Sequence, residues 1–253
     1  MKKYNSWQNY FSIINLGEVD STNNEAKRLI SNNTPNNHII VTATKQTEGR
    51  GRYGKKWDSI KGNLFMSIIL PCLAPLDTMS QLSFVTSLAI ERAITELSKR
   101  RNITCNIELK WPNDVLLNNK KVSGILLETA GQNNEYIIVG IGVNIKDSPN
   151  IVDYNTTSLT KENICNIDSI EMLNLIMVYF DKYYQLWVNK DFLSLRERWL
   201  KSAKDLKKQI TVNTGKSKKV GIFLDVDFSG AIRLKLDNGE IKKIHTGEVF
   251  FCA

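Results

Sequence analysis

Residues 46–57 read QTEGRGRYGKKW, and this stretch narrows the choice of fold. Gly49, Gly51 and Gly54 have the G-x-G-x-x-G spacing of a dinucleotide-binding turn. In that fold the glycine turn joins a strand to a helix, because the helix N-terminus holds the pyrophosphate. Here the turn is followed by KKWDSIKGNLFMSIIL, which predicts a loop and then a strand. The stretch therefore argues against a dinucleotide-binding fold.

Four cations surround the glycines of this loop: Arg50, Arg52, Lys55 and Lys56. Gly51 lies between the two arginines and has no side chain, so the backbone and both guanidinium groups can contact the same ligand. Guanidinium groups bind phosphate or carboxylate oxygens with paired hydrogen bonds. Trp57 follows directly, so the set suits an anion attached to a flat group. A flexible basic turn with solvated side chains explains the stretch equally well when it is taken alone.

Composition is that of an ordinary globular protein, with 42% hydrophobic and 24% charged residues among 253. A formal net charge of +8 suits an anionic partner, or a basic surface without one. The start, MKKYNSWQNYF, lacks the apolar core of a signal peptide, and runs such as YIIVGIGV are too short to span a membrane. The four cysteines form no C-x-x-C pair, which argues against a zinc site and favours a reducing compartment. We therefore expect a cytoplasmic protein with no metal ligands of its own.

Periodicity predicts a mixed α/β (α+β) domain with a largely antiparallel sheet. A long helix is expected to begin near Asp77, with Thr78 and Gln81 at capping-box spacing, and a second with Asp168 and Glu171 at the same spacing. The strand-like segments are FSIINLGEVD (11–20), HIIVTATK (38–45), NLFMSIIL (63–70), IELKW (107–111), DVLLN (114–118), KVSGILLE (121–128) and EYIIVGIGVNI (135–145). The helical segments are NEAKRLI (24–30), IEMLNLIMVYFDKYYQLWV (170–188) and LSLRERWL (193–200).

The character of the chain changes near residue 207. Short strands such as ITVN, VGIFLDVDF and AIRLKL follow one another, and FSG and DNG separate them with hairpin chemistry. Apolar residues alternate along 220–226, as on a half-buried strand. The sequence thus predicts a mixed domain over residues 1–206 and a small all-β domain over residues 207–253.

Two further motifs suggest a binding site. KWPNDV (110–115) places Lys110 at the end of a predicted strand, and Pro112 keeps the preceding residue extended. By itself this motif is an ordinary turn with a solvated lysine. GIGVN (140–144) puts small residues in a strand, which lets a ligand approach the backbone closely. Close packing against a helix is the alternative explanation.

Together these motifs resemble the biotin–protein ligases. STN (21–23), QTEGRGRYGKKW (46–57), GNLFMS (62–67), KWPNDV (110–115), KVSGILLE (121–128) and VGIGVNI (139–145) occur in the family's order. The tail GIFLDVDFSGAIRLKLDNGEIKKIHTGEV resembles the SH3-like barrel of bacterial members. The resemblance implies a class II synthetase-like catalytic domain followed by that barrel. Some members begin with a winged helix-turn-helix, for which residues 1–10 leave no room, so no specific DNA binding is expected.

The resemblance also implies an activity. Such enzymes activate biotin with ATP as biotinyl-5′-adenylate and then transfer it to a lysine of a biotin carboxyl carrier domain. Magnesium is expected to accompany ATP, although the sequence does not identify its ligands. Two alternatives remain: an enzyme of the same superfold that attaches lipoate or octanoate, and a non-enzymatic nucleic-acid-binding protein. The oligomeric state is open, with a homodimer as one option.

The site residues implied by the resemblance fall into three sets. The residues expected to bind biotin are Ser21, Thr22, Asn23, Gln46, Arg50, Gly51, Arg52, Lys110 and Gly124. Those expected to bind ATP are Arg50, Arg52, Trp57, Lys110, Asn113 and Asn144. Catalysis is expected from Lys110, Arg50 and Arg52, which can stabilise negative charge during adenylation. Trp111, His38 and His245 are expected to be structural.

Overall fold

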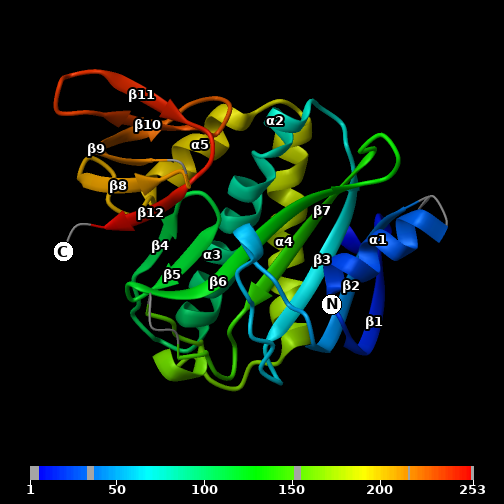
Figure 1. Ribbon diagram of the computed structural model, residues 1–253. Coiled ribbons are helices and arrows are strands. Elements are labelled where there is room, and N and C mark those ends of the chain that lie inside the picture. Colours follow the sequence, from blue (N-terminus) through cyan, green and yellow to red (C-terminus); the bar gives the residue numbers. More distant parts are fainter. Residues whose placement is uncertain (1–5, 33–36, 151–154, 216, 252–253) are drawn as a thin grey trace.

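The computed structural model describes residues 6–32, 37–150, 155–215 and 217–251 (Figure 1). The larger of its two sheets has seven strands in the order β1-β2-β3-β7-β6-β5-β4. These strands are β1 (Phe11–Val19), β2 (His38–Gln46), β3 (Leu64–Pro71), β4 (Ile107–Lys110), β5 (Asp114–Leu117), β6 (Lys120–Ala130) and β7 (Tyr136–Val143). Only β1 and β2 pair in parallel, which confirms the prediction of a mixed, largely antiparallel sheet.

Helices cover both faces of this sheet (Figure 1). On one face α1 (Thr22–Asn32) packs Ala26 and Ile30 against Val41, Ile69 and Ile138. On the other face lie α3 (Leu82–Arg100) and α4 (Ser169–Val188), with α5 (Phe192–Lys201) beside them. The central strands β3 and β7 are buried on both faces, which is why they read as continuous apolar runs.

The predicted long helix near Asp77 is in fact two helices. A short helix α2 (Leu76–Met79) precedes α3, and the Gln81 side chain makes no capping hydrogen bond. Instead its amide donates to the carbonyl of Phe228 at 2.6 Å and accepts from the indole of Trp187 at 2.7 Å. The predicted capping box is therefore wrong at this helix, because the Gln81 side chain bonds to residues distant in the chain and not to the helix start. At α4 the expected cap is present, since Asp168 accepts from the Glu171 amide at 2.7 Å.

The second sheet is antiparallel throughout, with the order β11-β10-β9-β8-β12. Its strands are β8 (Gln209–Asn213), β9 (Lys218–Val226), β10 (Ile232–Lys235), β11 (Ile241–Ile244) and β12 (Glu248–Phe251). Gly230 and Gly239 have positive φ angles, 79° and 84°, as the predicted FSG and DNG turns require. Among the described residues, short 3₁₀ segments lie at Ser6–Asn9, Arg52–Gly54 and Thr160–Glu162. In the described part of the chain, no helix is both long and apolar enough to cross a membrane.

The second sheet docks on the larger unit through its turn at 228–230. The indole of Trp111 donates to the carbonyl of Gly230 at 2.9 Å, and the Ser83 hydroxyl donates to the Pro112 carbonyl at 2.6 Å. Gly230 lies so close to Phe84 that a Cβ would stand 2.8 Å from its ring. The turn that carries the KWPND motif is thus held between α3 and the second sheet.

We expect Phe84→Ala to lower the free energy of unfolding by about 3–5 kcal/mol, because it leaves a cavity in a packed core. Phe84 is 2% exposed, and its ring centroid lies 5.7 Å from that of Phe192 and 4.9 Å from that of Trp199. Phe228 is 65% exposed, so Phe228→Ala should cost about 1 kcal/mol or less. Urea denaturation followed by circular dichroism measures both. Equal costs for the two variants would contradict this assignment of the core.

Candidate active site

One cavity brings together most of the residues singled out from the sequence. It lies among the start of α1, the glycine loop, the KWPND turn, strands β6 and β7, and the start of β12. The predicted site residues that line it are Ser21, Thr22, Asn23, Gln46, Arg50, Gly51, Arg52, Trp57, Lys110, Asn113 and Gly124. Asn144 lines a smaller adjoining cavity, which shares Trp57 with the first.

Three glycines of β6 and β7 allow side chains to lie flat on the sheet. A Cβ on Gly140 would stand 2.5 Å from the Asn23 amide oxygen, and one on Gly142 would stand 2.5 Å from the Trp57 indole. A Cβ on Gly124 would stand 2.9 Å from the same indole. The small residues of GIGVN therefore accommodate Asn23 and Trp57, and the nearest neighbour of Gly124 is the indole.

Hydrogen bonds organise the polar end of the cavity. Gln46 accepts from the Thr22 amide at 2.8 Å and donates to the Ser59 hydroxyl at 3.2 Å. Ser67 on β3 is fully buried, and its hydroxyl lies 2.6 Å from the Asn23 amide oxygen and 2.7 Å from the Thr22 hydroxyl. Sequence reasoning gave Ser67 no role. A lone serine inside the apolar run NLFMSIIL was the available signal, because a buried hydroxyl needs a partner.

Polar contacts anchor the glycine loop to the second sheet. The Arg52 guanidinium donates to the Gly247 carbonyl at 3.1 Å and to the Thr246 hydroxyl at 2.9 Å. Lys55 forms an ion pair with Glu248 at the start of β12. The loop contains no aliphatic residue, and its sequence alone offered no anchor. Its anchors on the second sheet are one ion pair and two hydrogen bonds to residues 193–195 positions away in the chain, so local sequence could not reveal them.

Lys110 stands at the end of β4, where a tight hairpin pairs it with Asp114. Burial lowers the pKa of the Lys110 ammonium below its ordinary value, the nearby Asp114 carboxylate opposes that shift, and Lys121 adds to it. Lys121 forms an ion pair with Asp114 at 2.7 Å and lies 5.5 Å from the centre of the Trp57 ring. The KWPND lysine is therefore not the solvated turn residue of the alternative reading.

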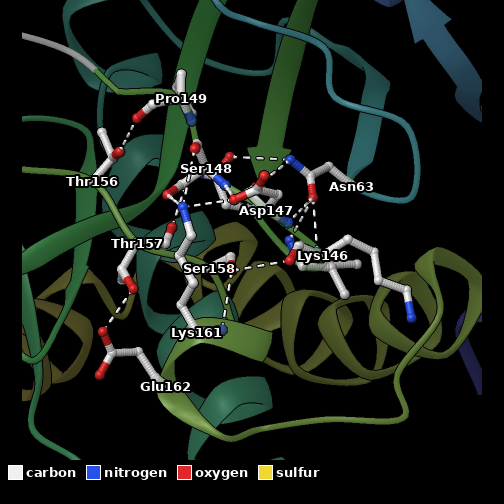
Figure 2. A network of polar contacts seen from close by, with 12 residues as sticks. Asn63, Lys146, Asp147, Ser148, Pro149, Thr156, Thr157, Ser158, Lys161 and Glu162 are labelled. Atoms are coloured by element: carbon white, nitrogen blue, oxygen red, sulfur yellow. Dashed lines mark hydrogen bonds and ion pairs between the residues drawn. The ribbon is translucent and has the colours of Figure 1, made fainter.

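A network behind the smaller cavity holds the segment that follows β7, as Figure 2 shows. The Asn63 amide oxygen accepts from the backbone amides of Ile145 and Lys146 at 2.9 Å each, and its nitrogen donates to the Asp147 carbonyl at 2.8 Å. Asn144 is buried beside it and donates to the Thr157 carbonyl at 3.0 Å. The hydrogen bond to Thr157 thus fixes the Asn144 side chain in the wall of the smaller cavity.

The arrangement combines a cationic wall with a neutral, hydrogen-bonding end. Arg50, Arg52, Lys110 and Lys121 all line the larger cavity, while the STN segment and Gln46 provide amide and hydroxyl groups. Such a cavity suits an anion joined to a polar ring. Within the described ranges, no three His, Cys, Asp or Glu side chains gather as a metal site.

Comparison with known proteins agrees with this chemistry. Residues 16–144 match the biotin/lipoate A/B protein ligase family. The chain belongs to this family. Residues 206–252 also match the biotin protein ligase C-terminal domain, which covers the second sheet. The chain is therefore a ligase, and its fold class is the one that its motifs predicted.

Individual relatives extend this likeness over nearly the whole chain. A biotin–[acetyl-CoA-carboxylase] ligase of Paracoccus denitrificans is 35% identical over 93% of this chain and 99% of its own length. The biotin protein ligase of Aquifex aeolicus, solved with biotin and ATP, superposes with a TM-score of 0.78 at 28% identity, covering 94% of this chain and 97% of its own. The Leishmania major enzyme, solved with biotinyl-5-AMP, has a TM-score of 0.61 at 26% identity over 92% and 98%.

We expect Ser67→Ala to destabilise the protein by about 1–3 kcal/mol, because it removes the hydroxyl partner of the buried Asn23 amide oxygen. The Thr22 hydroxyl loses one of its two contacts and keeps the one to Gln46 at 3.1 Å. The matched control is Ser31→Ala, since Ser31 is exposed and its hydroxyl contacts only a carbonyl of its own helix. Thermal and urea unfolding of both variants give the comparison. If Ser67→Ala were as stable as the control, the buried network would not contribute to folding.

Proposed function

We propose that this ligase attaches biotin to a lysine of a biotin carboxyl carrier domain through biotinyl-5′-adenylate. The observation that carries the proposal is the single cavity that joins the STN–Gln46 end to the cations Arg50, Arg52 and Lys110. The Aquifex enzyme was solved with biotin and ATP, and the Leishmania enzyme with biotinyl-5-AMP, which supports biotin and ATP as the substrates. The Paracoccus relative is named for acetyl-CoA carboxylase, which supports a carboxylase carrier as the partner.

The first step joins two anions. A biotin carboxylate oxygen attacks the α-phosphorus of ATP, the bond to the bridging oxygen breaks, and pyrophosphate leaves. Arg50, Arg52 and Lys110 reduce the repulsion and stabilise charge that develops in the transition state. Magnesium enters with the triphosphate as part of the substrate. The partly buried position of Lys110 strengthens its effect, since charges interact more strongly away from water.

The second step transfers the acyl group. The neutral amine of the carrier lysine attacks the adenylate carbonyl, an amide bond forms, and AMP leaves with the bonding electron pair. The amine loses its proton during this step. Neither step requires a nucleophile from the enzyme, so the cavity needs only to bind, orient and stabilise charge.

The proposed residue roles follow the position of each side chain. Ser21, Thr22, Asn23 and Gln46 hold the ureido ring by hydrogen bonds. Gly124 borders the bicyclic ring together with the Trp57 indole, which is its nearest neighbour. Arg50, Gly51 and Arg52 cover biotin and its adenylate. Trp57, Asn113 and Asn144 contact the nucleotide in this proposal. In support, Trp57 lines both cavities, Asn113 lines the larger one and Asn144 the adjoining smaller one.

We further propose that residues 1–206 form the catalytic domain and residues 207–253 an SH3-like domain that completes its cavity. The contacts of Arg52 and Lys55 with 246–248 support this division. A cytoplasmic location fits the free thiols of Cys72, Cys105 and Cys165.

The deciding experiment incubates the protein with MgATP, biotin and the biotin carboxyl carrier domain of an acetyl-CoA carboxylase, and reads the product by avidin blot. Label should appear on the carrier only when biotin and ATP are both present. A parallel reaction with lipoate and a lipoyl domain tests the alternative within the same family. Lipoylation without biotinylation would overturn the proposal.

Lys110→Gln should slow adenylate formation by roughly 10²-fold or more, because it removes positive charge beside the reacting phosphate. Biotin-dependent pyrophosphate exchange measures this step. Transfer from pre-made biotinyl-5′-adenylate should suffer less, since phosphoryl attack is already complete. Exchange near the wild-type rate would show that Lys110 does not act in the first step.

The pyrophosphate-exchange rate should also fall at alkaline pH. The pKa of Lys110 is lowered by burial from 10.5, so its ammonium loses its proton at a lower pH than an ordinary lysine. Below that folded-state pKa the cation is present, and above it the catalytic charge is lost. Lys110→Arg keeps its charge throughout this range, so its alkaline decline should move to higher pH whatever its absolute rate. An unchanged decline in Lys110→Arg would assign it to another group.

A further inference from the structure

Glu128 lies on β6 behind the wall of the larger cavity, and three donors from different elements converge on its carboxylate. Lys27 of α1 lies 2.8 Å from Oε1, while the Asn23 amide nitrogen at 2.7 Å and the Arg50 guanidinium at 2.8 Å both reach Oε2. Asn23 and Arg50 line the cavity, and Lys27 does not. Glu128 therefore joins the ring-binding end of the cavity to the glycine loop.

The Glu128 carboxylate is charged at neutral pH. Burial by itself raises the pKa of this group, but hydrogen bonds from Lys27 and Asn23, together with the charge of Arg50, lower it overall. An ionised carboxylate can only accept hydrogen bonds. The nitrogen of the Asn23 amide must consequently face Glu128, and its oxygen faces the Ser67 hydroxyl at 2.6 Å. One hydrogen and one lone pair of this amide remain for a ligand.

The same carboxylate restrains Arg50. Arg50 is held by an ion pair with Glu128 on the sheet. Arginine has five N–H donors in a rigid fork, and the contact with Glu128 uses one guanidinium nitrogen. The rest of the fork stays available to the cavity that Arg50 lines. Glu128 thus orients two side chains of the cavity with one charge.

We propose that Glu128 is a positioning residue that sets the affinity for biotin by orienting the Asn23 amide and the Arg50 guanidinium. The proposal rests on the function proposed above and concerns the same cavity. Glu128 acts through these two residues and touches neither substrate. The alternative is a plain ion pair that ties α1 to the sheet. That role would change stability without changing the affinity for biotin selectively.

Glu128→Gln is the principal test. Glutamine presents one oxygen and one NH₂ group, so it cannot accept from all three donors, and the Asn23 amide loses its fixed orientation. In pyrophosphate exchange, the KM for biotin should rise roughly tenfold, the loss expected for one charge-assisted hydrogen bond. The KM for ATP should rise less. Calorimetric titration with biotin alone should show the same loss of affinity in the absence of turnover.

The matched control is Glu18→Gln, which removes a glutamate from an exposed ion pair with Lys45 at 2.7 Å. Neither residue lines the cavity. Its KM for biotin should equal that of the wild type. A double-mutant cycle adds Asn23→Ala. If Glu128 acts partly through Asn23, the loss caused by Glu128→Gln should be clearly smaller in the Asn23→Ala background.

Each outcome decides the matter. A wild-type KM for biotin in folded Glu128→Gln, or equal rises in the KM values of biotin and ATP, would overturn the proposal. If circular dichroism shows that Glu128→Gln does not fold, Glu128→Asp keeps the charge near Lys27 but shortens the reach to Asn23 and Arg50, so the biotin KM should still rise. Unfolding of both variants would make Glu128 purely structural and would likewise overturn it. Lack of biotin-dependent exchange in the wild type would instead reject the proposed function itself.

Discussion

Positive charges converge on one cavity, and holding them together against their mutual repulsion is the constraint on which the site depends. The fold reduces this repulsion by placing a carboxylate beside each of three cations. Glu128 pairs with Arg50, Glu248 with Lys55 and Asp114 with Lys121. Each pair is partly buried or lies beside the cavity, where screening by water is weaker than on an open surface. The cations are thereby held in place before any anionic substrate arrives, which is the preorganisation that charge stabilisation requires.

This constraint explains why the second sheet is more than an appendage. Its turn at 228–230 accepts a hydrogen bond from the indole of Trp111, the residue next to the lysine of the KWPND motif. Its segment at 246–248 accepts a hydrogen bond from Arg52 and forms an ion pair with Lys55 of the glycine loop. The KWPND turn and the glycine loop of the larger unit are therefore both held partly by residues of the second sheet. Substitutions in the second sheet should therefore affect the cavity through these contacts.

Much of this architecture could be predicted from local pattern. The strands appear where apolar runs and alternation indicated, the FSG and DNG turns have their glycines at positive φ angles, and Asp168 caps α4. The prediction failed at Gln81, whose spacing indicated a cap but whose side chain bridges Phe228 and Trp187. Polar side chains near a helix start can satisfy either local or distant partners, and only packing selects between them. The roles of the individual site residues stay predictions, although the cavity gathers nearly all of them.

The sequence by itself determined the chemical inventory and its local geometry: a glycine loop rich in cations, a lysine before a proline turn, and small residues along two strands. These depend on residues close together in the chain, where spacing and backbone preference are informative. Only the tertiary structure decided which counter-charge meets each cation, that Lys110 is partly buried, and that Ser67 and Glu128 support Asn23 from behind. Arg50 and Glu128 are 78 positions apart, and Lys55 and Glu248 are 193 apart. No local pattern records such a pairing, because it arises only when strands distant in sequence are placed side by side.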